Sequence, residues 1–246
     1  MNDQNGAARL ALVTGAGRGI GFEVVRQLAQ HDFTVLLTAR DEGKAAAAAQ
    51  TLTPNGLKVQ PASLDVTSDA SVRQLAAAVD REFGRLDVLV NNAAGFVDWS
   101  ETAATADLQA AHAVLETNLF GGWRTSQAFL PLLRRSTHGR IVNVSSGAGS
   151  HGDQQFGLTT NGGTAASYGI SKAALNALTA KLAAELAGTG VLVDAVCPGL
   201  TATAPGMEAM GARPIAEGAA SVLWAELLPD DGPSGGFFRD GKPVPW

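Results

Sequence analysis

The stretch that decides the fold runs Arg9-Leu-Ala-Leu-Val-Thr14-Gly-Ala-Gly-Arg-Gly-Ile-Gly21. Its first six residues form a short apolar run, which is typical of a strand buried on both faces. A glycine-rich turn follows, and Ile20–Gln30 has the pattern of a helix. Such a junction points free backbone N–H groups and the positive end of a helix dipole at an anion, and its glycines let a pyrophosphate approach closely. The stretch predicts a nucleotide-binding unit; the alternative is a glycine turn without a ligand.

The rest of the chain alternates between strand and helix patterns. Further strands are expected at 33–38, 57–64, 86–90, 139–144 and 191–196, and helices at 44–52, 68–83, 165–186 and 214–227, with helical stretches between 105 and 133. Strand–helix alternation with short connections requires right-handed crossovers, so we expect an α/β fold with a doubly wound, mostly parallel sheet and helices on both faces. Loops at about 147–164 and 199–213 follow strand ends, where such sheets bind ligands.

Composition excludes several classes of protein. The 246 residues are 46% apolar and 17% charged, with a net charge of −5 and no basic stripe, which argues against a nucleic-acid partner. The start is polar and no apolar run reaches about 18 residues, so we expect neither a signal peptide nor a membrane span. A single cysteine, Cys197, fits a reducing compartment. These features predict a soluble, cytoplasmic protein, and the four dispersed histidines predict no metal site.

Thr14, Gly15, Gly19 and Gly21 match the Thr-Gly-x-x-x-Gly-x-Gly fingerprint of the short-chain dehydrogenase/reductase family. Further matches follow in the family's order through nearly the whole chain, which therefore resembles this family. The resemblance implies one Rossmann domain over residues 1–246 with a seven-stranded sheet. The enlarged loop before Tyr168 and the C-terminal segment look most like carbonyl-reductase-type members.

The resemblance also implies a dinucleotide site. Its expected residues are Thr14, Gly15, Gly17, Arg18, Gly19, Ile20, Gly21, Arg40, Asp65, Val66, Asn92, Ala93, Tyr168, Lys172, Pro198, Gly199 and Thr203. Ala39 stands where NAD-preferring members have an acidic residue, and two guanidinium groups, Arg18 and Arg40, suit a ribose 2′-phosphate. We therefore expect NADP(H), unless Arg40 only caps a solvated loop. The family's Asn-Asn-Ala-Gly element is altered, because Ala94 precedes Gly95.

Tyr168 and Lys172 are four residues apart, so both lie on one face of the expected helix. An ammonium near the phenol favours the phenolate and lowers its pKa. Without a function, the same spacing describes an ordinary surface pair. The resemblance implies that Tyr168 is the proton donor, that Lys172 holds the nicotinamide ribose, that Ser146 holds the carbonyl oxygen and that Asn118 supports a proton relay. Ser145 is the alternative to Ser146.

The implied function is NADPH-dependent reduction of a ketone or aldehyde, or oxidation of an alcohol in reverse. A non-catalytic NADP-sensing regulator of the same fold is the alternative. A nucleotide-sugar epimerase would need a longer C-terminal region. A hydrolase built on Ser146, His151 and Asp153 lacks the Gly-x-Ser-x-Gly elbow.

The substrate is a small carbonyl or alcohol compound whose identity the sequence leaves open. Candidate pocket residues, which alternatively pack a lid, are Phe96, Trp99, His151, Phe156 and Met207. The sequence does not decide between a monomer and a homo-oligomer, either dimer or tetramer.

Overall fold

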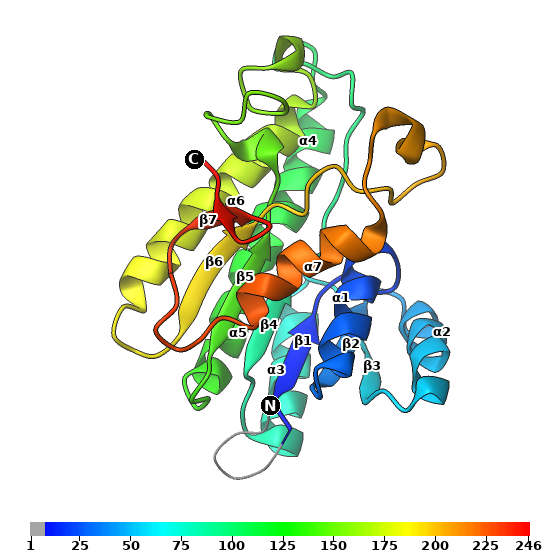
Figure 1. The fold of residues 1–246 in the computed structure, drawn as a ribbon, viewed down its shortest axis with the longest axis vertical. Coiled ribbons are helices and arrows are strands. Elements are labelled where there is room, and N and C mark those ends of the chain that lie inside the picture. The colour runs from blue at the N-terminus through cyan, green and yellow to red at the C-terminus, as the bar shows by residue number, and fades with distance from the viewer. Residues whose placement is uncertain (1–7) are drawn as a thin grey trace.

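A computed structural model describes residues 8–246; the polar start at 1–7 lies outside the described residues. Its strands form one sheet in the order β3-β2-β1-β4-β5-β6-β7-β8 (Figure 1). The bounds are β1 (Leu10–Val13), β2 (Thr34–Ala39), β3 (Val59–Ser63), β4 (Val88–Asn91), β5 (Arg140–Val144), β6 (Leu192–Val196), β7 (Phe237–Arg239) and β8 (Lys242–Pro243). Strands β1 to β7 pair in parallel, which confirms the expected doubly wound sheet.

The expected strand count is one too low. The additional strand, β8, pairs antiparallel with β7, with Phe238 opposite Pro243 and Arg239 opposite Lys242. β8 is two residues long and exposed, so it has no hydrophobic alternation from which a strand could be predicted.

Helices cover both faces of the sheet, as expected. Their bounds are α1 (Gly19–Gln30), α2 (Glu42–Leu52), α3 (Asp69–Phe83), α4 (Leu108–Leu115), α5 (Gly122–Leu133), α6 (Ala166–Glu185) and α7 (Ile215–Glu226). Residues of α1, α2 and α7 share one apolar core, and residues of α3, α5 and α6 share the other. Figure 1 shows α7 crossing the near face of the sheet beside α1. Within residues 8–246, no helix has the length and hydrophobicity needed to cross a membrane.

Strand β1 shows why the deciding apolar run is continuous. Ala11 and Val13 point into the core under α1 and α7, whereas Leu10 and Leu12 point into the opposite core. All four side chains are buried. Because successive side chains of a strand alternate between faces, a strand between two helical layers must be apolar at every position.

The same strand fixes the place of the site. β1 pairs with β2 on one side and with β4 on the other. The strands that follow β1 therefore extend the sheet first in one direction, through β2 and β3, and then in the other, from β4 onward. At such a switch point the connections diverge and open a crevice at the carboxyl ends of the strands.

Candidate active site

The glycine turn after β1 packs directly against the segment after β4. The hydroxyl oxygen of Thr14 accepts hydrogen bonds from the backbone N–H groups of Asn92 and Ala93, both at 2.9 Å. Gly15 has φ +64°, and a Cβ at this position would lie 2.8 Å from the Ala93 Cα. At Gly21 a Cβ would lie 2.3 Å from Nδ2 of Asn92. Glycine at position 15 therefore allows two backbones to pack closely, and glycine at position 21 leaves room for the Asn92 side chain.

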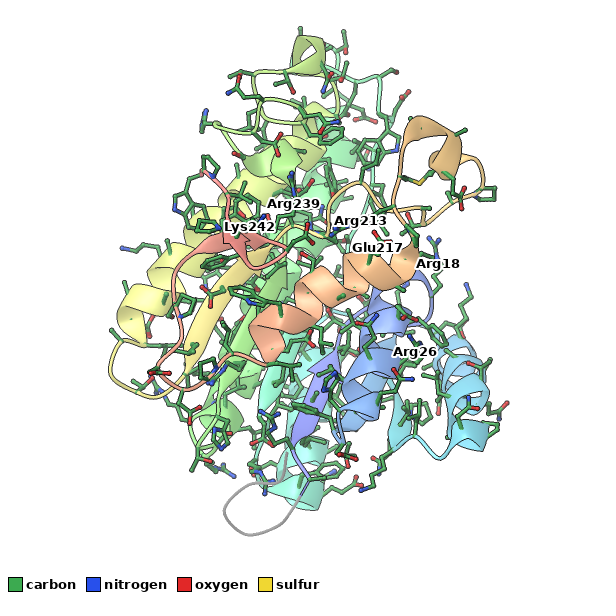
Figure 2. The ribbon with its side chains drawn as sticks, viewed as in Figure 1. Arg18, Arg26, Arg213, Glu217, Arg239 and Lys242 are labelled. Carbon is green, nitrogen blue, oxygen red and sulfur yellow. The ribbon has the colours of Figure 1, made fainter. Side chains whose placement is uncertain are left out.

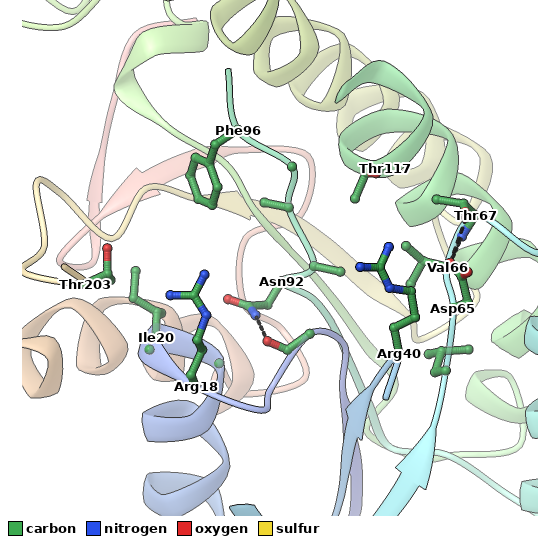
Figure 3. A pocket seen from close by; sticks show the side chains of 17 residues that line it. Arg18, Ile20, Arg40, Asp65, Val66, Thr67, Asn92, Phe96, Thr117 and Thr203 are labelled. Atoms are coloured by element: carbon green, nitrogen blue, oxygen red, sulfur yellow. Dashed lines mark hydrogen bonds between the residues drawn. The ribbon is translucent and has the colours of Figure 1, made fainter. Parts of the chain in front are cut away.

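A cleft of about 440 Å³ opens beside this turn (Figure 3). The expected cofactor residues that line it are Gly15, Arg18, Gly19, Ile20, Gly21, Arg40, Asp65, Val66, Asn92, Ala93 and Thr203. The cleft is also lined by Phe96, one of the candidate pocket residues, and by five residues that were not expected there: Leu64, Thr67, Ala94, Gly95 and Thr117. Its volume and its glycine-rich, partly polar wall suit an extended anionic ligand.

Some expected cofactor residues, namely Thr14, Gly17, Pro198 and Gly199, do not line the cleft. Thr14 is buried, and its hydroxyl oxygen accepts the two hydrogen bonds described above. Gly17 faces the methyl group of Ala39. The carbonyl of Pro198 accepts a 2.7 Å bond from Nε of Arg213, whose guanidinium also packs against Gly199.

The charged groups of the cleft favour an anion. Neither the Arg18 nor the Arg40 guanidinium has a hydrogen bond or ion pair with another of residues 8–246, and Figure 3 shows both side chains pointing into the cleft. Burial alone would raise the pKa of Asp65, but bonds from the backbone and hydroxyl of Thr67 and the charge of Arg40 lower it. The cleft thus offers two free cations and one ionised hydrogen-bond acceptor.

Tyr168 and Lys172 lie one turn apart in α6, near the end of β5. Ser146 follows β5, and its side chain hydrogen bonds to Tyr168. Its neighbour Ser145 is buried and donates a 2.5 Å bond to Oδ1 of Asn176. Of the two serines, the structure therefore brings Ser146 to the phenol.

The expected lowering of the phenol pKa is wrong for this structure. Burial raises the pKa of Tyr168 to about 12, and the bond from Ser146 only partly opposes this. Lys172 does not neutralise the effect, because its ammonium donates a 2.8 Å bond to the Val144 carbonyl and lies 5.6 Å from the centre of the Tyr168 ring. Burial also lowers the pKa of Lys172 to about 8. Tyr168 is thus a protonated phenol at neutral pH.

Titration of the ligand-free protein tests this directly, because Tyr168 is its only tyrosine. We expect almost no tyrosinate absorbance at pH about 10, where a free phenol is half ionised. Ultraviolet difference spectra of the folded protein and of the protein in urea give the two curves. Coincident curves would contradict the raised pKa.

Asn118 lies in a π-helical turn, Glu116–Gly121, that separates α4 from α5. Its Oδ1 accepts a 2.7 Å bond from the N–H of Gly95, and its Nδ2 donates to the Gly95 carbonyl and to the Ser171 hydroxyl. π-Helical turns are rare and occur often at functional sites. Here the turn lets one side chain hold both the wall of the cleft and the helix that carries Tyr168.

Two of the candidate pocket residues contact the phenol. The rings of Phe96 and Trp99 lie 5.7 and 5.2 Å from the Tyr168 ring, centre to centre. Met207 lies near the cleft, where its sulfur accepts a 3.8 Å bond from Thr203. His151 is exposed, and its backbone N–H donates to the carbonyl of Trp246. The backbone of Phe156 donates to Asp153.

The two loops near the site are tied to the strand-β7 region by contacts that the sequence analysis missed. Nη2 of Arg239 donates a 2.7 Å bond to the buried carboxylate of Asp153, and Arg213 pairs with Asp240 at 2.8 Å. Figure 2 labels both arginines above α7. Because Asp153 is bonded to Arg239, it is not oriented as the acid of a hydrolytic triad. The partners are many residues apart, so no local pattern could reveal them.

No cluster of three or more His, Cys, Asp or Glu side chains in the described part of the chain could hold a metal ion.

Comparison with known proteins agrees with this geometry. The family model described as short chain dehydrogenase matches residues 9–212. The chain is 32% identical to carbonyl reductase 3 (NADPH) of Mus musculus, covering 97% of this chain and 99% of that protein, and 35% identical to (+)-neomenthol dehydrogenase of Arabidopsis thaliana, covering 94% and 95%.

Among solved structures, an NADPH-bound carbonyl reductase from chicken fatty liver superposes with a TM-score of 0.85 at 31% identity, covering 97% of this chain and 99% of that one. The parallel sheet, the glycine turn and the Ser146–Tyr168–Lys172 grouping thus occur in a chain whose relatives match it over nearly its full length. The protein belongs to the short-chain dehydrogenase/reductase family.

Proposed function

We propose that the protein is an NADP(H)-dependent oxidoreductase that reduces a ketone or aldehyde to an alcohol, and catalyses the reverse oxidation, with Tyr168 as the proton donor. The observation that carries the proposal is the contact between the cleft and Tyr168. Phe96 lines the two-arginine cleft and also stacks on Tyr168, so the cleft and the phenol meet at one side chain. A carbonyl group bound beside Phe96 would reach both the cleft and the Tyr168 hydroxyl.

The cleft fits a dinucleotide phosphate. Gly15 and Gly19 have positive φ and no side chain, so a pyrophosphate could approach the backbone closely at these two positions. Arg18 and Arg40 would hold the ribose 2′-phosphate, and Asp65 the adenine. When bound, the cofactor supplies or accepts the hydride. The mouse and chicken relatives are described as NADPH-dependent or NADPH-bound, which supports NADP(H) here.

Side chains of the protein itself carry out the proton transfer. Tyr168 keeps its proton at neutral pH and gives it to the carbonyl oxygen as the alcohol forms. Ser146, beside the phenol, would turn its single hydroxyl proton from Tyr168 to the same oxygen when a carbonyl compound binds. Lys172 would hold the nicotinamide ribose, since its ammonium lies 5.6 Å from the centre of the Tyr168 ring. Asn118 holds Gly95 and Ser171, so its side chain positions this arrangement.

Arg40→Ala should weaken NADPH binding about 10- to 100-fold, because it removes a charge-assisted contact. NADH binding should change little, since NADH has no 2′-phosphate. Fluorescence titration with both cofactors measures the ratio. Arg26→Ala is the matched control, because Arg26 pairs with Glu23 in α1 and does not line the cleft. Equal weakening of both cofactors by Arg40→Ala would show that Arg40 is structural.

Loss of NADPH absorbance with a panel of ketones, aldehydes and quinones tests the function as a whole. Turnover by the wild type that disappears in Tyr168→Phe would support it. Tight NADPH binding without turnover of any compound would favour the NADP-sensing regulator.

A further inference from the structure

Phe96 and Trp99 are two large aromatic side chains that the fold leaves exposed beside Tyr168. They are 58% and 57% exposed, although burying them would be favourable. Phe96 stacks nearly parallel to Tyr168, Trp99 meets the same ring edge-on, and the two lie 5.9 Å from each other. Exposed aromatic surface gathered at a concave site is typical of ligand recognition.

The segment that carries these rings is fixed at both ends. At one end, Asn118 bonds the N–H and the carbonyl of Gly95. At the other, Oε1 of Glu101 accepts bonds from the hydroxyl and the N–H of Ser167, the latter at 2.8 Å. Ser167 is buried in the first turn of α6 and precedes Tyr168. The rings are therefore held against the helix that carries the phenol.

Glu101 also replaces a missing helix cap. The residue before α6 is Ala165, which has φ +52° and no side chain that can accept a bond. A carboxylate at a helix N-terminus satisfies a free N–H and complements the helix dipole. One residue thus positions both the start of α6 and the aromatic segment.

The position of Phe96 relates the rings to the substrate. Figure 3 shows Phe96 across the cleft mouth from Ile20 and Thr203, and its ring also faces Tyr168. The group bonded to a carbonyl between the cleft and the phenol must therefore lie next to Phe96 and Trp99.

We propose that Phe96 and Trp99 are specificity-determining residues, an aromatic wall anchored by Glu101, which selects carbonyl compounds that carry a flat aromatic ring over equivalents with a saturated ring. A flat ring can stack on one member and meet the other edge-on, whereas a puckered ring cannot. That the ligand is a carbonyl compound rests on the proposed function; recognition of its ring does not require turnover.

Binding to the NADP⁺-loaded protein tests the wall, because this complex has no hydride to transfer. Isothermal titration calorimetry compares 4-phenylbutan-2-one with 4-cyclohexylbutan-2-one, which differ only in the ring. We expect the wild type to bind the phenyl compound about fivefold more tightly. Phe96→Leu and Trp99→Leu should each reduce this ratio toward one. Trp123→Leu should keep it, because Trp123 is an exposed tryptophan of α5 that stacks on Phe120.

Glu101 variants test the anchor separately. Glu101→Gln keeps the acceptor oxygen and should keep the ratio, whereas Glu101→Ala should lose it. Equal affinities in the wild type, no detectable binding of the phenyl compound, or a ratio that survives both Phe96→Leu and Trp99→Leu would overturn the proposal. A wild type that prefers the phenyl compound yet reduces no carbonyl would instead contradict the proposed function and leave the wall standing.

Discussion

Tyr168→Phe is expected to lower kcat by a factor of about 10²–10⁴, the usual contribution of a positioned proton donor. The substitution keeps the ring, and so keeps the contacts with Phe96 and Trp99. It removes only the hydroxyl that bonds Ser146 and would protonate the carbonyl oxygen. NADPH affinity should stay within about twofold, because the phenol does not line the cleft. Steady-state NADPH oxidation and a fluorescence titration measure the two quantities.

The two serines supply a matched comparison. Ser146→Ala should also lower kcat, whereas Ser145→Ala should mainly lower stability, since it breaks the buried bond to Asn176. Turnover by Tyr168→Phe above about a tenth of the wild-type rate would refute the role of proton donor.

Much of the fold could be predicted because its rule is local. The strand between two helical layers must be apolar at every position, and Leu10–Val13 shows this without any knowledge of the partners. The place of the cleft followed from the same strand and its glycine turn. By contrast, β8 exists because the chain after β7 turns back on it, with the N–H of Val244 donating to the carbonyl of Phe237.

The chemistry of the site was less predictable than its residues. The four-residue spacing correctly placed Tyr168 and Lys172 on one face of α6. The spacing could not show that the Lys172 ammonium donates a hydrogen bond to the carbonyl of Val144, at the end of β5. The contact between Glu101 and Ser167 likewise joins residues 66 positions apart. A pKa depends on burial and on such distant partners, so it follows from the fold and not from spacing.

Glu226→Gln is expected to remove a large pH-dependent loss of stability. Glu226 is the last residue of α7 and is fully buried. Neither of its carboxylate oxygens has a hydrogen-bond partner among the described residues. Burial raises its pKa well above 4.5. Between that value and the folded-state pKa, the unfolded chain releases a proton that the folded chain retains. The free energy of unfolding of the wild type therefore falls as pH rises through this window, by about 1.4 kcal/mol per pH unit.

Urea unfolding of the two proteins from pH 5 to about 8 measures the difference between their free energies of unfolding. Because all other titrating groups are shared, this difference isolates Glu226. The neutral amide fills the same space at every pH, so Glu226→Gln should gain steadily on the wild type as pH rises. Glu185→Gln is the control, since Glu185 is exposed at the end of α6 and should give a curve parallel to the wild type. If the Glu226→Gln curve is also parallel, Glu226 ionises in the folded protein over the same pH range as in the unfolded chain, and the raised pKa is contradicted.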